Sequence, residues 1–113
     1  MSNIHPSAVV ASTANIADDV EVGPFAVIHE HVQIDAGCSI GAHSVIHSHT
    51  LMGKNNRILD HVVLGGEPQD ISYSNEQTQL KIGNANIIRE FVSIHRSTNT
   101  EQATTIGDGC YIC

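Results

Sequence analysis

The sequence has no tryptophan and few basic residues: five Lys and Arg stand against twelve Asp and Glu, for a formal net charge of −7. A nucleic-acid-binding surface needs a basic face against the phosphates, so we expect no nucleic-acid partner. No apolar run approaches the roughly 18 residues that a membrane-spanning helix requires, so we expect no membrane span. The N-terminal residues lack a basic segment followed by an apolar one, which predicts no signal peptide and a cytoplasmic location.

Cysteine is also scarce, with Cys38, Cys110 and Cys113 as the complete set. Three cysteines do not make a disulfide framework. The last two form a C-x-x-C pair, but a structural zinc site needs four ligands. We therefore expect Cys38 and Cys110 to be packing residues, and we expect neither a bound metal nor a cofactor.

What the sequence does contain is a repeat of six residues. Every sixth position is aliphatic without a miss: Ile4, Val10, Ile16, Val22, Ile28, Ile34, Ile40, Ile46, Met52, Ile58 and Leu64. Four residues after each of them stands a small or β-branched residue, with Asn56 as the exception. This period fits neither a helix, which repeats every 3.6 residues, nor a flat strand, which repeats every two. It is typical of a hexapeptide β-helix.

A hexapeptide repeat predicts an all-β coil in which three hexads make one turn, so that residue i lies beside residue i+18. The aliphatic residues point inward and fill the coil. Glycine recurs directly after the aliphatic positions, where we expect tight turns at positive φ. The glycines in question are Gly23, Gly41, Gly53, Gly65, Gly83 and Gly107.

The period breaks after Leu64, where the next aliphatic position is occupied by Asp70, and it returns at Ile82. Glycine, proline and polar residues fill the interval, which predicts a loop over about residues 66–79 that leaves the coil. Loops on a rigid scaffold often carry function. We treat residues 1–113 as one hexapeptide-repeat domain.

A second break, at Thr100, predicts a bulge over residues 97–105. All five basic residues lie between positions 54 and 96. They are either scattered solvated charges or a local site for an anionic ligand on an acidic protein.

Six of the eight histidines form pairs that are 18 residues apart and are therefore predicted to stack. The pairs are His29 with His47, His31 with His49, and His43 with His61. Neutral imidazoles are common metal ligands. The zinc-binding hexapeptide enzymes of the γ-carbonic anhydrase type have a histidine pair with four residues between its members, and no such pair occurs here, so a metal site is not expected.

Two segments of this sequence resemble a known family. They are Gly-Gly-Glu-Pro-Gln-Asp at residues 65–70 and Ile-Ile-Arg-Glu-Phe-Val-Ser-Ile-His-Arg at residues 87–96, supported by Ile-His-Pro-Ser-Ala at residues 4–8 and Val-Gly-Pro-Phe at residues 22–25. The chain is similar to the N-terminal half of the bacterial acyl-[acyl-carrier-protein]–UDP-N-acetylglucosamine O-acyltransferases, which begin lipid A synthesis. The resemblance implies a left-handed parallel β-helix and a homotrimer with active sites between subunits. It also implies acyl transfer from acyl carrier protein to the 3-hydroxyl of UDP-N-acetylglucosamine.

The same resemblance assigns site residues. Asp70 matches the family's loop aspartate, which helps to hold the sugar, and Gln69 precedes it as in the family. His95, followed by Arg96, matches a histidine that lines the cleft and positions substrate or charge. The alternative for His95 is a wall histidine that is hydrogen-bonded to a neighbouring strand. The general base, a histidine that takes a proton near neutral pH, is expected beyond Cys113, so no catalytic residue is assigned within this chain.

The sequence departs from the family at two positions, with Ser72 in place of a lysine and Ser97 in place of a glycine. The family's C-terminal coils and helical tail are also absent, so we expect the 113 residues alone to be inactive. One alternative is a related hexapeptide N-acyltransferase or acetyltransferase. Another is a non-catalytic paralogue that binds UDP-sugars.

Overall fold

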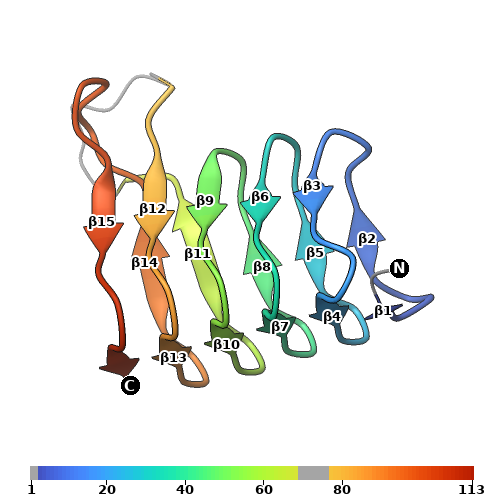
Figure 1. The fold of residues 1–113 in the computed structure, drawn as a ribbon. Helices are drawn as coiled ribbons and strands as arrows, with labels where there is room; N and C mark the ends of the chain where they lie inside the picture. The colour runs from blue at the N-terminus through green and yellow to red at the C-terminus, as the bar shows by residue number, and fades with distance from the viewer. Residues whose placement is uncertain (1–2, 69–76) are drawn as a thin grey trace.

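The computed structural model describes residues 3–68 and 77–113, and every regular element within them is a short β-strand (Figure 1). The strands form three parallel sheets. Sheet A contains β1 (Asn3–Ile4), β4 (Glu21–Val22), β7 (Ser39–Ile40), β10 (Arg57–Ile58), β13 (Ile87–Ile88) and β16 (Tyr111–Ile112). Sheet B contains β2 (Val9–Val10), β5 (Val27–Ile28), β8 (Val45–Ile46), β11 (Val63–Gly66) and β14 (Ser93–His95). Sheet C contains β3 (Asn15–Ile16), β6 (Gln33–Ile34), β9 (Thr50–Met52), β12 (Leu80–Ile82) and β15 (Thr104–Ile106).

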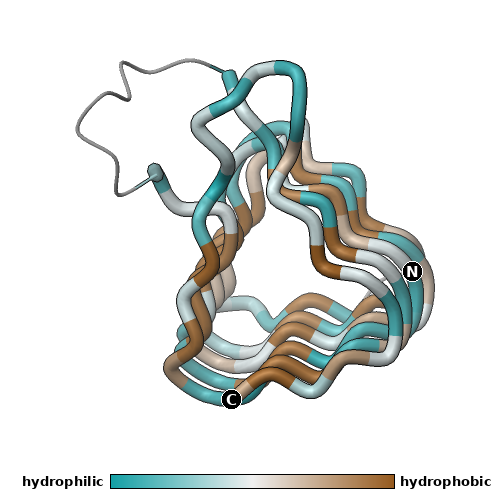
Figure 2. Tube along the Cα trace, turned by 90° about the vertical axis from the view of Figure 1, so that its left-hand side faces the viewer, coloured by the Kyte–Doolittle hydropathy of each residue, from teal (hydrophilic) through white to brown (hydrophobic). Residues whose placement is uncertain are grey.

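The three sheets are the walls of a triangular prism, which is seen along its axis in Figure 2. Successive strands of the chain lie in different walls, and each strand pairs in parallel with the strand one coil away. The fold is the left-handed parallel β-helix expected for this sequence. No helix long and apolar enough to cross a membrane occurs in the described ranges 3–68 and 77–113.

The core is the column of aliphatic side chains that the six-residue period predicts. Ile28, Ile46 and Ile88 are at most 1% exposed, and each of them lies in a different coil. A buried aliphatic side chain of this size contributes about 1.5–3 kcal/mol. Cys38 is also buried in this core, and its thiol lies 3.0 Å from the carbonyl oxygen of Gly53, which confirms its expected packing role.

The spacing of 18 residues between neighbouring coils holds only as far as Leu64. Beyond it, Leu80 pairs with Thr50, which is 30 positions earlier and therefore adds twelve residues to that coil. Tyr111 pairs with Ile87, which is 24 positions earlier and adds six. The rule that residue i lies beside residue i+18 is therefore wrong across these two additions.

Both additions leave the prism at the corner between sheets B and C. One lies between β11 and β12 and the other between β14 and β15. The second addition includes the bulge expected over residues 97–105, and no strand is assigned between 96 and 103. Figure 2 shows how the chain extends from this one corner while the three walls remain stacked. The walls persist because the aliphatic residues on either side of each addition still point into the same core.

The reason for most of the glycines differs from the expected one. Positive φ occurs mainly three residues after the aliphatic positions, not one, and mostly at residues other than glycine: Phe25, His31, His43, His49, Asn55, His61, Ala85 and Phe91. Gly41 has no positive φ, but a Cβ built on it would lie 2.5 Å from the carbonyl carbon of Leu59 in the next coil. Glycine at such a position allows two backbones to approach closely. Gly65 is the exception, with a φ of +75°.

The polar exception in the repeat, Asn56, is a satisfied buried residue. Its amide nitrogen donates to the carbonyl oxygens of Gly53 and Gly83, at 3.0 and 2.8 Å. Its side-chain oxygen accepts a hydrogen bond of 2.9 Å from the backbone N–H of Asn86. The side-chain oxygen of Asn86 in turn accepts from the backbone N–H of Cys110, at 2.7 Å. Asparagine side chains therefore connect successive coils across both additions.

Candidate functional site

His95 and Arg96 lie at the end of β14, at the corner from which both additions depart. The pairing of β14 with β11 shifts by one residue at this point, because Leu64 pairs with Ile94 but Gly66, not the residue before it, pairs with His95. A β-bulge of this kind redirects side chains, and bulges are frequent beside active sites. The shift decides which groups lie next to His95.

The bulged residue is Gly65, which only glycine can occupy without strain. Its φ of +75° lies in the left-handed region, and a Cβ built on it would collide with the hydroxyl oxygen of Thr50. The local sequence Gly-Gly therefore produces the bulge, and the bulge positions the residues that follow it.

The imidazole of His95 is held in one tautomer. Its Nδ1 lies 2.9 Å from the backbone carbonyl oxygen of Glu67, and a carbonyl oxygen only accepts, so Nδ1 carries the proton. In the neutral ring, Nε2 then has a lone pair that accepts a hydrogen bond. The Ser93 hydroxyl is 3.4 Å from Nε2, which is a long and weak contact. His95 is thus a wall histidine bonded to a neighbouring segment, and its Nε2 is still available to a ligand.

Arg96 supports the bulge. Its backbone N–H donates to the carbonyl oxygen of Gly66 at 2.9 Å, and its Nη1 donates to the carbonyl oxygen of Gly65 at 2.8 Å. The side chain is half-buried. These two bonds position Arg96 across the bulge, so that it holds β11 and β14 together at the site.

The other two residues assigned from the sequence, Asp70 and Gln69, lie outside the described residues. Ser72 lies outside them as well. Their positions relative to His95 remain predictions.

His47 belongs to the same cluster, although sequence reasoning did not assign it to the site. A Cβ built on Gly66 would lie 3.4 Å from Nδ1 of His95 and 3.9 Å from Cδ2 of His47, so the two imidazoles flank Gly66. His47 stacks on His29, with ring centroids 4.9 Å apart, as predicted. The stacking could be read from the 18-residue spacing, but the approach of His47 to His95 depends on the bulge.

Burial lowers the pKa of His47 below its usual value, and the nearby imidazole of His29 and guanidinium of Arg96 act in the same direction. The carboxylate of Glu67 opposes this effect but does not reverse it. His47 is therefore a neutral imidazole at neutral pH, able to donate one hydrogen bond and accept another.

The remaining predicted histidine stacks are also confirmed. The rings of His31 and His49 have centroids 5.5 Å apart, and those of His43 and His61 are 4.9 Å apart. Phe25 stacks on His43 and so extends the second pair. Within the described part of the chain, no group of three or more His, Cys, Asp or Glu side chains is arranged to hold a metal ion.

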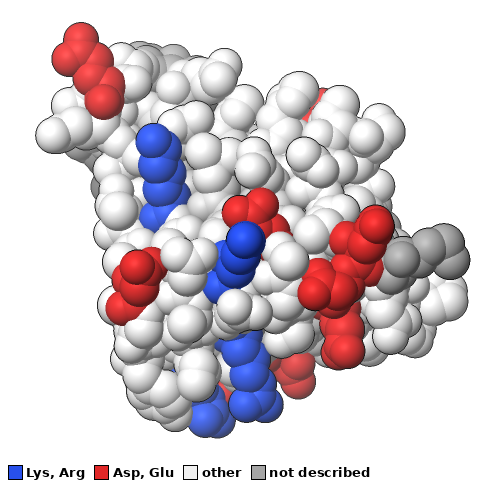
Figure 3. Space-filling model, in the orientation of Figure 1, with Lys and Arg blue, Asp and Glu red and all other residues white. Residues whose placement is uncertain are grey.

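The basic residues do not gather at one place, which favours scattered charge over a local cationic site. Arg57 belongs to sheet A, Lys81 to sheet C, and Arg96 follows sheet B. On the face shown in Figure 3, basic side chains lie over the C-terminal half, and acidic side chains lie at both ends. Arg89 is engaged with Glu90 in an exposed ion pair of 2.9 Å.

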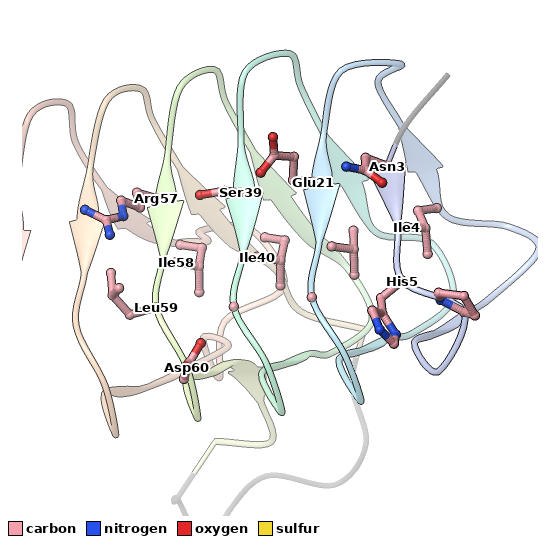
Figure 4. A pocket seen from close by; sticks show the side chains of 14 residues that line it. Asn3, Ile4, His5, Glu21, Ser39, Ile40, Arg57, Ile58, Leu59 and Asp60 are labelled. Atoms are coloured by element: carbon pink, nitrogen blue, oxygen red, sulfur yellow. The ribbon is translucent and has the colours of Figure 1, made fainter.

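A separate groove of about 420 Å³ lies on sheet A, away from His95 (Figure 4). Glu21, Ser39 and Arg57 line one side of it, and His5 and Leu59 stand at its two ends. Gly23 and Gly41 stand between these two ends in sequence register and contribute no side chain. The groove and the sequence-predicted site are therefore on different walls of the prism.

Comparison with known proteins places both the repeat and the site in context. Residues 13–48 match the family described as bacterial transferase hexapeptide (six repeats). The chain is 52% identical to the acyl-[acyl-carrier-protein]–UDP-N-acetylglucosamine O-acyltransferase of Xanthomonas euvesicatoria pv. vesicatoria, over 91% of this chain and 39% of that protein. It is 56% identical to the enzyme of the same name from Paraburkholderia phytofirmans, over 99% of this chain and 43% of that protein.

Solved structures agree in fold. LpxA from Acinetobacter baumannii superimposes with a TM-score of 0.91 at 41% identity, over 95% of this chain and 42% of that one. The UDP-N-acetylglucosamine O-acyltransferase of Moraxella catarrhalis superimposes with a TM-score of 0.94 at 37% identity, over 96% of this chain and 43% of that one. The chain spans about two fifths of the length of the curated relatives it matches. Over nearly all of its own length, the chain is thus a homologue of the acyl-[acyl-carrier-protein]–UDP-N-acetylglucosamine O-acyltransferases.

Proposed function

We propose that these residues belong to an acyltransferase that moves an acyl chain from acyl carrier protein to the 3-hydroxyl of UDP-N-acetylglucosamine, the first step of lipid A biosynthesis. The observation that carries the proposal is the identity of 52–56% to proteins of that name over 91–99% of this chain. The proposal includes a homotrimer with clefts between subunits and the cytoplasmic location expected from the sequence. It requires no cofactor, because the acyl thioester on the carrier protein is the second substrate.

In this proposal the described residues bind and orient the acceptor. The lone pair on Nε2 of His95 accepts a hydrogen bond from the ligand, because Nδ1 is already committed to Glu67. Arg96 keeps the bulge closed through its two bonds to the glycine carbonyls. Asp70 and Gln69 are proposed to hold the sugar from the loop. The proton of the attacking hydroxyl is taken by a general base that lies outside these 113 residues.

The test uses the full-length gene product with an acyl carrier protein thioester and UDP-N-acetylglucosamine. Asp70→Ala is expected to lower kcat/KM at least about tenfold, because a hydrogen bond to a charged group is worth about 1.5–3 kcal/mol. The trimer should remain intact in analytical ultracentrifugation. Asp18→Ala, which changes an exposed aspartate far from the corner between sheets B and C, is the matched control and should leave kcat/KM unchanged. Wild-type turnover by Asp70→Ala would contradict the role of the aspartate.

The same assay separates the alternatives. Ser72, where the family has a lysine, favours a paralogue that binds UDP-sugars without turnover. Such a protein would bind UDP-N-acetylglucosamine but release no product with any acyl thioester. A related N-acyltransferase would instead use an acceptor with a 3-amino group in place of the 3-hydroxyl.

A further inference from the structure

Gly66 leaves a gap in the outer face of sheet B between two imidazoles. His47 follows β8, Gly66 ends β11 and His95 ends β14, and these three strands are consecutive neighbours in the sheet. The bulge at Gly65 brings Gly66, rather than the residue before it, opposite His95. Because Gly66 has no side chain, the space between the two rings is open to a ligand.

Both rings that border the gap have unused hydrogen-bonding capacity. His95 is committed through Nδ1, and its Nε2 has only the 3.4 Å contact with Ser93. The ring of His47 makes no hydrogen bond to any residue in the ranges 3–68 and 77–113, although stacking on His29 holds its plane within 6° of parallel. The stack orients His47 without consuming its nitrogens.

The charges around the gap favour a neutral ligand group over an anion. On the side of β11 and β14, His47 faces Arg96, Glu67 and His95, and on the side of β5 it faces His29. The guanidinium and the carboxylate offset each other, and burial keeps the pKa of His47 low. A neutral imidazole both donates and accepts, which matches the two capacities of a hydroxyl group.

We propose that His47 is a further substrate-binding residue, which together with His95 forms a subsite over Gly66 that recognises hydroxyl groups of a sugar ring. This inference rests on the proposed function, in which the ligand is a nucleotide sugar. One hydroxyl donates to Nε2 of His95, and another exchanges a hydrogen bond with His47. The sugar ring lies over Gly66, where any larger residue would place its side chain.

The test compares the affinities of UDP-N-acetylglucosamine and UDP in the full-length gene product by isothermal titration calorimetry. His47→Phe keeps an aromatic ring for the stack on His29 but removes both nitrogens. We expect its Kd for UDP-N-acetylglucosamine to rise about tenfold and its Kd for UDP to stay within twofold. His47→Gln, which keeps a donor and an acceptor, should recover most of the lost affinity. His43→Phe, in another stacked pair, is the matched control and should bind both ligands as the wild type does.

The pH dependence provides a second readout. Recognition of hydroxyls needs neutral imidazoles, so the affinity for UDP-N-acetylglucosamine should weaken as the pH falls below about 6.5, the ordinary pKa of histidine. Recognition of phosphate would strengthen it instead. The inference is overturned if His47→Phe binds the sugar nucleotide normally, if it loses UDP and UDP-N-acetylglucosamine equally, or if affinity rises at low pH. A wild-type protein that binds neither ligand overturns the proposed function and this inference together, whereas wild-type turnover with an indifferent His47→Phe overturns the inference alone.

Discussion

The coils before and after Leu64 have the same walls but different corners. In the earlier coils every strand pairs at a spacing of 18 residues, whereas the later strands pair at spacings of 30 and 24. The aliphatic column continues through both regions, and Ile88 is as buried as Ile28. The difference shows that each wall is positioned by its inward side chains, so a corner can lengthen without disturbing the stack. The candidate site lies where that freedom has been used.

The two regions also differ in the small position of the repeat. The earlier coils fill it with residues such as Ala26 and Val32, which contribute only packing. The coils that are joined across the additions fill it with Asn56 and Asn86, which contribute hydrogen bonds from coil to coil. Directional bonds thus reinforce the stack where the regular spacing is lost.

The strongest test of this equivalence is the core itself. Ile28→Ala and Ile88→Ala should each lower the free energy of unfolding by about 2–5 kcal/mol, because each leaves a cavity in a fully buried position. Urea denaturation of both variants measures the effect. A much smaller loss for Ile88→Ala would show that the later coils do not unfold with the earlier ones.

Removal of the asparagine ladder should have the next largest effect. Asn56→Ala leaves the carbonyl oxygens of Gly53 and Gly83 without their donor, and a buried unsatisfied group costs about 1–3 kcal/mol. Asn15→Ala, an exposed asparagine in the regular coils, is the control and should change stability by less than about 0.5 kcal/mol. Equal losses in the two variants would contradict the role given to the ladder.

The two glycines of the bulge should differ from each other. Gly65→Ala places a Cβ at positive φ, which costs about 1–2 kcal/mol, and also forces it against Thr50. Gly66→Ala meets its nearest neighbour, Nδ1 of His95, at 3.4 Å and should cost less. Thermal unfolding ranks the two variants. If Gly66→Ala proved the more damaging, the bulge would not be located at Gly65.

The smallest expected effect is the dependence of stability on pH. Burial lowers the pKa values of His47 and His49, so the unfolded chain binds protons more readily than the folded one as the pH falls. Their contribution to stability is present above about pH 6.5 and is lost as the pH falls through the lower folded values. The melting temperature should therefore fall between pH 7.5 and pH 5, and less steeply in His47→Phe. Val9→Thr, which removes no titrating group, should keep the wild-type slope.

A large part of this structure could be predicted from the periodicity. Burial of an aliphatic residue at every sixth position requires the chain to bend after each short strand, which leads to three walls and a 18-residue coil. The stacking of His29 on His47 and the packing of Cys38 follow from the same spacing. The interruption after Leu64 was also visible, because a polar residue at an inward position cannot be buried without a partner.

The tertiary structure decided what the period does not contain. Across the additions, the partner of a strand is set by long-range pairing, so neither the 30-residue register nor the Asn56 ladder follows from local sequence. The one-residue shift at Gly65 brings Gly66 opposite His95 and places His47 on its other side. The sequence by itself determined which residues face inward, because burial has the same period as the repeat. Only the fold decided which outward residues meet, because those contacts depend on the register between coils.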